Sequence, residues 1–144
     1  MKTISDTIRN AVKNYKIKDI VINQYKSLQD YNTIKDAIKM ILSTQNKMIL
    51  IYHKTTMIGF LTKKHILKAL QHDDENASIT KYMHRALNFV DAGIDLLTAR
   101  KLLAMASEHI LIVKEDNQII GIIDKENVDE LLLFVTAKKQ AITL

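Results

Sequence analysis

Four consecutive residues are suited to binding an anion: Thr62, Lys63, Lys64 and His65 combine a hydroxyl, two ammonium groups and an imidazole. They stand where the apolar spacing of a helix begins, and Lys68 lies about one turn further on. Cations at this place oppose the helix dipole, but together with the backbone N–H groups of the helix end they favour a bound phosphate. We therefore expect an anion site here, and the alternative is a solvated helix face.

The segment 62 residues later carries the opposite charge. Asp124 stands in the place of Thr62, and Asn127 in the place of His65. The Asn127 amide could still form a hydrogen bond with a ligand, but the carboxylates around it would repel a phosphate. These carboxylates belong to Asp124, Glu126, Asp129 and Glu130. We therefore expect any anion to bind at the first segment.

Other chemistry is missing from the sequence. The five histidines form no His-Glu-x-x-His pair or other close ligand cluster, so we expect them at surface or turn positions. The three glycines build no phosphate-cradling loop, no Gly-x-Ser-x-Gly elbow occurs, and the chain has no cysteine. The sequence therefore predicts no enzyme and no metal site. The histidines are His53, His65, His72, His84 and His109.

The composition is that of a folded globular chain, with 47% hydrophobic and 26% charged residues. Residues 1–75 carry 13 Lys/Arg against 7 Asp/Glu, and residues 76–144 carry 8 against 9. Tyrosines in the basic half are scattered, so we expect no nucleic-acid partner. No apolar run reaches the roughly 20 residues of a membrane span, and the first ten residues lack the apolar core of a secretory signal. We expect a soluble, cytoplasmic protein.

An internal repeat positions the candidate residues. Shifting the sequence by 62 positions aligns residues 17–70 with residues 79–132 without a gap. Identities are few, but residue classes keep the same order: an apolar helical segment, an apolar strand, a polar turn, a second apolar strand and another helix. The second strand has glycine in its third place in both copies, at Gly59 and Gly121.

The periodicity predicts the elements of each copy. In the first copy we expect a helix over residues 33–45 capped by Asn32 or Thr33, strands over 48–52 and 57–61, and a helix over 63–70. In the second copy we expect a helix from Asp95, as its cap, to about 107, strands over 110–113 and 119–123, and a final helix. Short strands near 26–29 and 87–90 would complete βαββα in each copy. The predicted domains are an N-terminal helix over 1–16, a first copy over 17–72, a second copy over 77–137 and a tail over 138–144.

A βαββα unit used twice, with a Gly-apolar-apolar-Thr segment leading into a helix, resembles the cystathionine-β-synthase (CBS) domain family over residues 17–135. The strongest local elements are residues 57–65 and 119–127. The resemblance implies an α/β fold in which two βαββα motifs pack sheet to sheet with pseudo-twofold symmetry. It also implies a Bateman module, a non-catalytic regulatory pair that binds adenine nucleotides or adenosyl compounds in the cleft between the copies.

The resemblance also implies ligand contacts. Nucleotide-binding members carry Ser or Thr after the Gly-apolar-apolar segment and, three positions on, an Asp that accepts hydrogen bonds from ribose hydroxyls. Here the first copy keeps the hydroxyl but lacks the carboxylate, and the second copy departs at both positions. The candidate residues are Thr62 for phosphate or ribose, Lys63 and Lys64 for phosphate charge, His65 at the ribose position, Lys47, Met48 and Ile49 for an adenine edge, and Asp124 and Asn127 in the second copy.

Two functions are compatible with these residues. In the first, AMP, ADP, ATP or S-adenosylmethionine binds in the first copy and changes the packing of the two copies, and a fused or separate effector protein responds. In the second, the chain is a ligand-free dimerisation and assembly domain with a degenerate nucleotide site. Both functions imply a homodimer, and neither requires a membrane span in this chain.

The end of the second copy, residues 121–135, also resembles the CBS region of site-two intramembrane metalloproteases. The resemblance rests on its acidic residues and on the apolar run 131–135. This run, which precedes two lysines, could touch a membrane surface. A final helix that covers the core or a dimer interface is the simpler interpretation.

Overall fold

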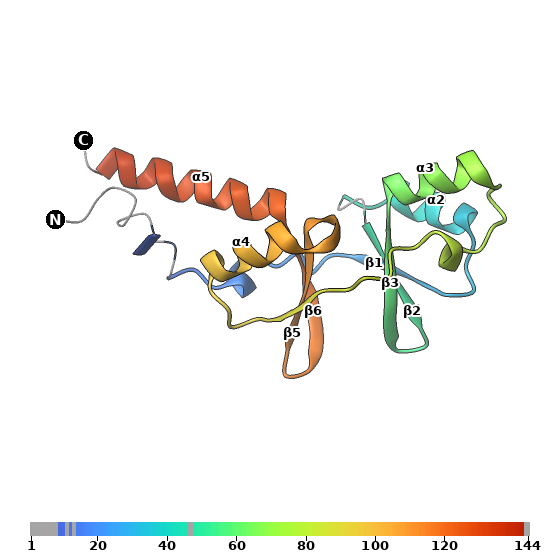
Figure 1. The fold of residues 1–144 in the computed structure, drawn as a ribbon, viewed down its shortest axis with the longest axis horizontal. Coiled ribbons are helices and arrows are strands. Elements are labelled where there is room, and N and C mark those ends of the chain that lie inside the picture. Colours follow the sequence, from blue (N-terminus) through green and yellow to red (C-terminus); the bar gives the residue numbers. More distant parts are fainter. Residues whose placement is uncertain (1–8, 11, 13, 46–47, 143–144) are drawn as a thin grey trace. The chain divides into compact units, whose positions relative to one another are not determined.

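The computed structural model describes residues 9, 10, 12, 14–45 and 48–142, and the chain divides into two compact units (Figure 1). The first unit spans residues 24–87, and the second joins residues 88–144 to the residues before 24. The first unit contains β1 (Lys26–Gln29), α2 (Ile34–Leu42), β2 (Met48–His53), β3 (Thr56–Thr62), α3 (Lys63–His72) and the 3-10 turn η2 (Ile79–Lys81). The second contains η1 (Ile17–Asp19), β4 (Phe89–Asp91), α4 (Leu96–Met105), η3 (Ser107–His109), β5 (Ile110–Glu115), β6 (Gln118–Asp124) and α5 (Lys125–Ile142).

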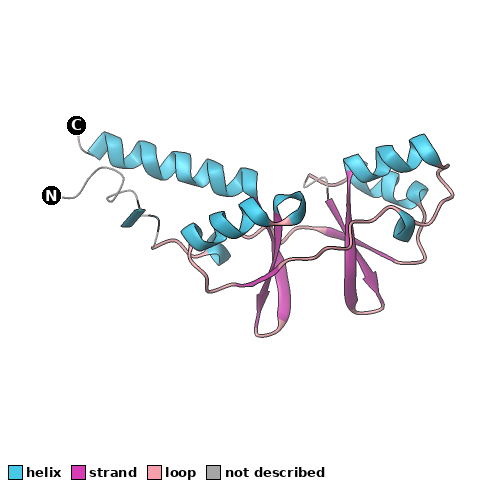
Figure 2. Cartoon of the chain, in the orientation of Figure 1, coloured by secondary structure: helices cyan, strands magenta, loops and turns pink. Residues whose placement is uncertain are grey.

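Each unit holds a three-stranded sheet with the same topology (Figure 2). In the first sheet β1 is parallel to β2, and β2 is antiparallel to β3. β4, β5 and β6 repeat this arrangement. A helix makes each crossover between parallel strands, and a tight turn joins each antiparallel pair. The predicted βαββα motifs of an α/β fold are confirmed, including the two short strands with a weak sequence signal.

α2 is shorter than predicted because its end is capped early. It begins after Thr33, one of the two predicted caps, but ends at Leu42, three residues before the predicted end. The Ser43 hydroxyl donates to the carbonyl oxygen of Met40 at 2.8 Å, a local bond that competes with continuation of the helix. α4 begins after its predicted cap, Asp95.

The two ends of the chain belong to the second unit. Most of the predicted helix over residues 1–16 lies outside the described residues. Where the chain is described, residues 9, 10 and 12 are helical, Val12 is fully buried, and Tyr15 packs against the same core. At the other end α5 continues to Ile142 and therefore includes most of the predicted tail.

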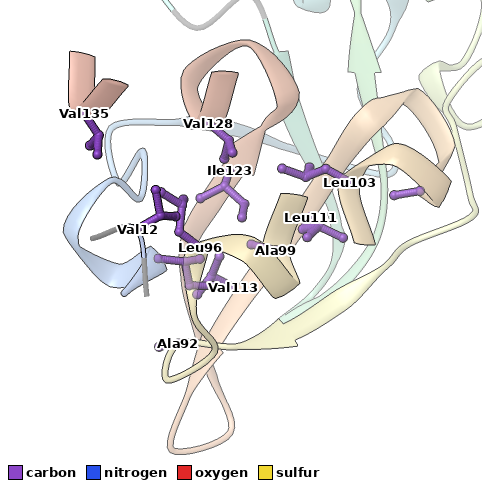
Figure 3. Packing of buried hydrophobic residues seen from close by; sticks show 12 residues of the cluster. Val12, Ala92, Leu96, Ala99, Leu103, Leu111, Val113, Ile123, Val128 and Val135 are labelled. Atoms are coloured by element: carbon purple, nitrogen blue, oxygen red, sulfur yellow. The ribbon is translucent and has the colours of Figure 1, made fainter. Parts of the chain in front are cut away.

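Equivalent positions build the core of both units. Figure 3 shows the second-unit core, in which side chains of α4, α5 and the sheet meet. Ile17 and Ile79, which are also 62 residues apart, are each buried in the unit of the other copy. The repeat in the sequence is therefore mainly a repeat of core positions. Buried Ile34, Ala37, Ile41, Ile49, Ile51, Leu61 and Ile66 of the first unit correspond to Leu96, Ala99, Leu103, Leu111, Val113, Ile123 and Val128 of the second.

The backbone repeats the same exchange of leading segments. The Ile22 N–H donates to the carbonyl oxygen of Ile122 at 2.8 Å, and its equivalent His84 donates to Phe60 at 2.8 Å. Each leading segment therefore forms an antiparallel bridge with the last strand of the other copy. The exchange follows from the chain path alone and occurs in both units.

The two aligned glycines are required by this exchange. A Cβ atom on Gly121 would lie 2.2 Å from Cγ1 of Val21 and 2.4 Å from the carbonyl oxygen of Ile22. A Cβ atom on Gly59 would lie 2.7 Å from the carbonyl oxygen of His84. No side chain fits at either place, which explains the shared glycine in β3 and β6.

Candidate ligand site in the first unit

The register of the first sheet gathers predicted ligand residues at one end. Met48 is the antiparallel partner of Thr62, and Ile49 is the parallel partner of Lys26. At this end β1 and β2 begin, β3 ends and α3 begins, so the two predicted lysines of α3 follow directly, and both are exposed. Ile49 lies in the middle strand, where backbone groups point to the flanking strands. Lys47 lies outside the described residues.

A polar pocket opens at the same end of the first unit. Its volume is about 410 Å³, within the range that ligand sites occupy. The pocket is lined by the start of β1 and the loop after α2, that is by Gln24, Tyr25, Lys26, Ser43, Thr44 and Gln45. Sequence reasoning missed these residues, because a short polar run after a helix is typical of any loop. Comparison of the copies could have found them, since four of the corresponding positions hold Ala86, Leu87, Met105 and Ala106.

Two side chains hold the wall of the polar pocket in place. Thr44 is buried. Burial raises the pKa of the Tyr52 hydroxyl, and the charge interaction and hydrogen bond with Tyr25 raise it further. Because Tyr52 belongs to β2, this bond ties the pocket to the sheet.

The Thr62 hydroxyl and the His65 ring are bonded to each other. His65 Nδ1 accepts the backbone N–H of Thr62 at 2.9 Å and lies 3.0 Å from Thr62 Oγ1. Because Nδ1 receives an N–H, it carries a lone pair, so the hydroxyl hydrogen points toward it and the neutral ring holds its proton on Nε2. In this arrangement Thr62 has no hydrogen to donate to a phosphate, and a ribose contact to His65 must use Nε2.

His65 is buried, so the prediction of a surface or turn histidine is wrong at this position. The side chain is 9% exposed, and its ring centroid lies 6.1 Å from Phe60 and 5.9 Å from His84. His84 Nε2 is buried and has no hydrogen-bond partner. A metal-binding histidine usually donates its second N–H, whereas His65 Nδ1 accepts, so this cluster is built as core packing. His53 is exposed, as predicted, and contacts Asp30 at 2.7 Å.

The equivalent helix start in the second unit is closed by its own carboxylate. Asp124 Oδ1 accepts the backbone N–H of Asn127 at 2.7 Å, as an N-cap aspartate does. The carboxylate therefore occupies the place that a phosphate would take at a helix end. Lys125, the next residue, contacts Asp129 at 2.6 Å. Charges at the start of α5 are thus satisfied within the helix.

The second copy matches a known sequence family. Residues 79–133 match the CBS domain family. The CBS domain of the bacterial CNNM/CorC family Mg²⁺ transporter, in a structure with ATP, has the same fold with a TM-score of 0.75 and 16% identity, covering 88% of this chain and 93% of that one. The chain contains a CBS domain pair.

Other CBS proteins share the fold of the whole pair. The CBS-pair protein CBSX2 from Arabidopsis thaliana has a TM-score of 0.69 and 17% identity, covering 85% of this chain and 97% of that one. A hemolysin-like protein containing a CBS domain from Oenococcus oeni has a TM-score of 0.72 and 18% identity, covering 88% and 96%. No curated protein is a significant sequence match to the chain. Across the residues that the structure describes, no helix combines the length and apolar character needed to cross a bilayer.

Proposed function

We propose that this CBS pair is a regulatory module that binds an adenine nucleotide or adenosyl compound in its first copy and passes a conformational change to an effector protein. The polar pocket carries the proposal, because it lies at the sheet end where Thr62 and the lysines of α3 also stand. A CBS domain with the same fold has been solved with ATP. The pair acts in the cytoplasm and without catalysis of its own in this proposal.

The ligand would divide its contacts between the two parts of this end. The polar pocket offers hydroxyls and amides suited to the neutral part of a nucleoside, with Met48 and Ile49 at the adjoining strand start. Lys63 and Lys64 offer charge for the phosphates at the start of α3. The second copy offers a carboxylate at the equivalent place, so binding is expected in one copy only.

Signal transfer requires the ligand to bind two arrangements of the protein unequally. A ligand that bridges the start of β1 and the start of α3 would hold these elements together. An effector that prefers this arrangement would then bind more tightly by the same factor. The effector is either fused to the pair or separate from it.

Calorimetric titration with AMP, ADP, ATP and S-adenosylmethionine tests the proposal. We expect at least one ligand to bind, and the double substitution Lys63→Ala and Lys64→Ala to weaken a phosphate-bearing ligand about tenfold or more. The matched control is Lys125→Ala, at the position equivalent to Lys63, which should leave the affinity unchanged. Absence of heat with all four ligands, or equal losses in the control, would contradict it.

A second candidate function is a ligand-free assembly domain. The bond between Thr62 and His65 favours it, because the hydroxyl and the ring satisfy each other at the place where the resemblance expects a ligand. This function predicts a stable dimer in sedimentation whose unfolding temperature does not change with any of the four ligands. A bound ligand adds stability according to its concentration and affinity, so thermal unfolding separates the two functions.

A further inference from the structure

We propose that the chain pairs with a second copy of itself in a heterotypic way, with the helices of the first unit of one chain against the helices of the second unit of the other. The first helix face consists of the exposed leucines on α2 and α3, and the second helix face is the groove between α4 and α5. The proposal goes beyond ligand sensing, since it requires no ligand and concerns different surfaces.

The first helix face is an apolar ridge. Leu42 on α2 is 77% exposed, and Leu67 and Leu70 on α3 are 49% and 44% exposed. α2 packs directly against α3, so these side chains belong to neighbouring helices. Large exposed apolar side chains that gather on one surface mark an interaction site.

The second helix face is hollow where the first one protrudes. A groove of about 420 Å³ lies between α4 and α5, with apolar walls from Leu103, Ala104, Val128 and Leu132. Leu133, which is 67% exposed, also lines this groove. An apolar groove of this size accepts one or two side chains such as leucine.

The repeat shows that the two helix faces are complementary in shape. Leu42 and Ala104 are 62 residues apart, so the first unit carries a large exposed side chain where the second carries a methyl group. Leu67 likewise corresponds to Asp129, a residue that lines the groove. A ridge against a groove buries apolar surface with close packing, whereas two ridges or two grooves do not.

Charge also favours the unlike pairing. Lys64 corresponds to Glu126 and Lys68 to Glu130, and all four side chains are exposed. An unlike pairing brings opposite charges toward each other at these positions, and a like pairing brings equal charges together. Such complementarity selects the partner and its orientation more than it adds affinity.

One face of each kind is present in every chain, so two chains can satisfy both faces around a two-fold axis. A closed pair of this kind has two identical contacts. Substitution of Leu42 therefore removes a central apolar side chain twice, and Leu42→Glu is expected to weaken self-association about 100-fold.

Cross-linking tests the orientation, and the chain suits it because it has no cysteine of its own. One sample carries Leu42→Cys and a second, longer tagged sample carries Ala104→Cys; the two are mixed and oxidised mildly. We expect a mixed dimer between the two samples and little linkage within either sample alone. Thr55→Cys, in the exposed turn between β2 and β3, gives the rate of random linkage.

Three outcomes would overturn the proposal: efficient linkage of Leu42→Cys with itself, linkage no faster than that of Thr55→Cys, or a monomer in sedimentation at micromolar concentration. Charge reversal gives a second readout that does not depend on a disulfide. Lys68→Glu and Glu130→Lys should each weaken the wild-type dimer, and mixing the two variants should not restore it. The doubly reversed chain should recover association, and failure to recover would contradict the assigned pairing of faces.

Discussion

The starts of α3 and α5 occupy the same place in two copies of one motif, yet they solve the same problem differently. At α5 the Asp124 carboxylate accepts the Asn127 N–H and completes the helix with a negative charge. At α3 the His65 ring accepts the Thr62 N–H, and the end keeps exposed lysines beside it. The first end is left suited to an anion and the second is not. Divergence of function between the copies thus begins with the choice of a helix cap.

The starts of α2 and α4 show that a cap can change without such a consequence. In α2 the Asp36 carboxylate accepts the backbone N–H of Thr33 at 3.0 Å. In α4, Asp95 accepts the backbone N–H of Thr98 at 2.8 Å. The two residue types have exchanged positions, since 33 corresponds to 95 and 36 to 98. Each helix start keeps one carboxylate, so charge is preserved here and altered at α3 and α5.

The glycines give the largest effect on stability that separates the two units. Gly121→Ala should lower the free energy of unfolding by about 3 kcal/mol, because its Cβ would press against the backbone of Ile22 at 2.4 Å. Gly59→Ala should cost about 1–2 kcal/mol, since its nearest backbone atom is farther away at 2.7 Å. Urea unfolding measures both, and an equal or reversed order would show that the leading segments are not held as described.

Removal of the caps at α3 and α5 should have unequal effects. Asp124→Ala should lower the free energy of unfolding by about 1 kcal/mol, because the Asn127 N–H loses its acceptor. Thr62→Ala should cost less, roughly 0.5 kcal/mol, since the His65 ring still accepts the backbone N–H. Thermal unfolding of both variants at neutral pH provides the measurement. A larger loss for Thr62→Ala would mean that the hydroxyl carries the cap.

Acid should weaken both α2 and α4 by modest amounts. The backbone hydrogen bond from Thr33 lowers the pKa of Asp36, and the backbone hydrogen bond from Thr98 lowers the pKa of Asp95. A lowered pKa stabilises the fold at pH values above the unfolded-state pKa of about 4, and this stability is lost as pH falls through the lower folded-state value. Asp36→Asn and Asp95→Asn should therefore flatten the dependence of stability on pH below about 4. An unchanged slope in both variants would contradict these caps.

Much of the fold could be predicted because the sequence repeats its core. Ile34 and Leu96, or Ile49 and Leu111, are apolar for the same reason in both copies, and strict spacing makes them visible. The buried position of His65 could not be predicted, because a histidine on a helix has no periodic signature of burial. The polar pocket was missed because its lining comes from two loops that only the fold brings together.

The site could be predicted only in part for a related reason. Met48 and Thr62 meet because of strand register, which the hairpin in the sequence already implied. That Thr62 and His65 bond to each other depends on a ring orientation that residue types do not fix. The metalloprotease resemblance of the tail stays a prediction.

The central claim is that two copies with one core have only one ligand-competent end, and backbone amide NMR during titration with ATP tests it most directly. We predict shift changes in the polar pocket and at residues 62–64, with little change at the positions 62 residues later. Changes at residues 124–126 of equal size, or none in the first unit at saturating ligand, would contradict the claim.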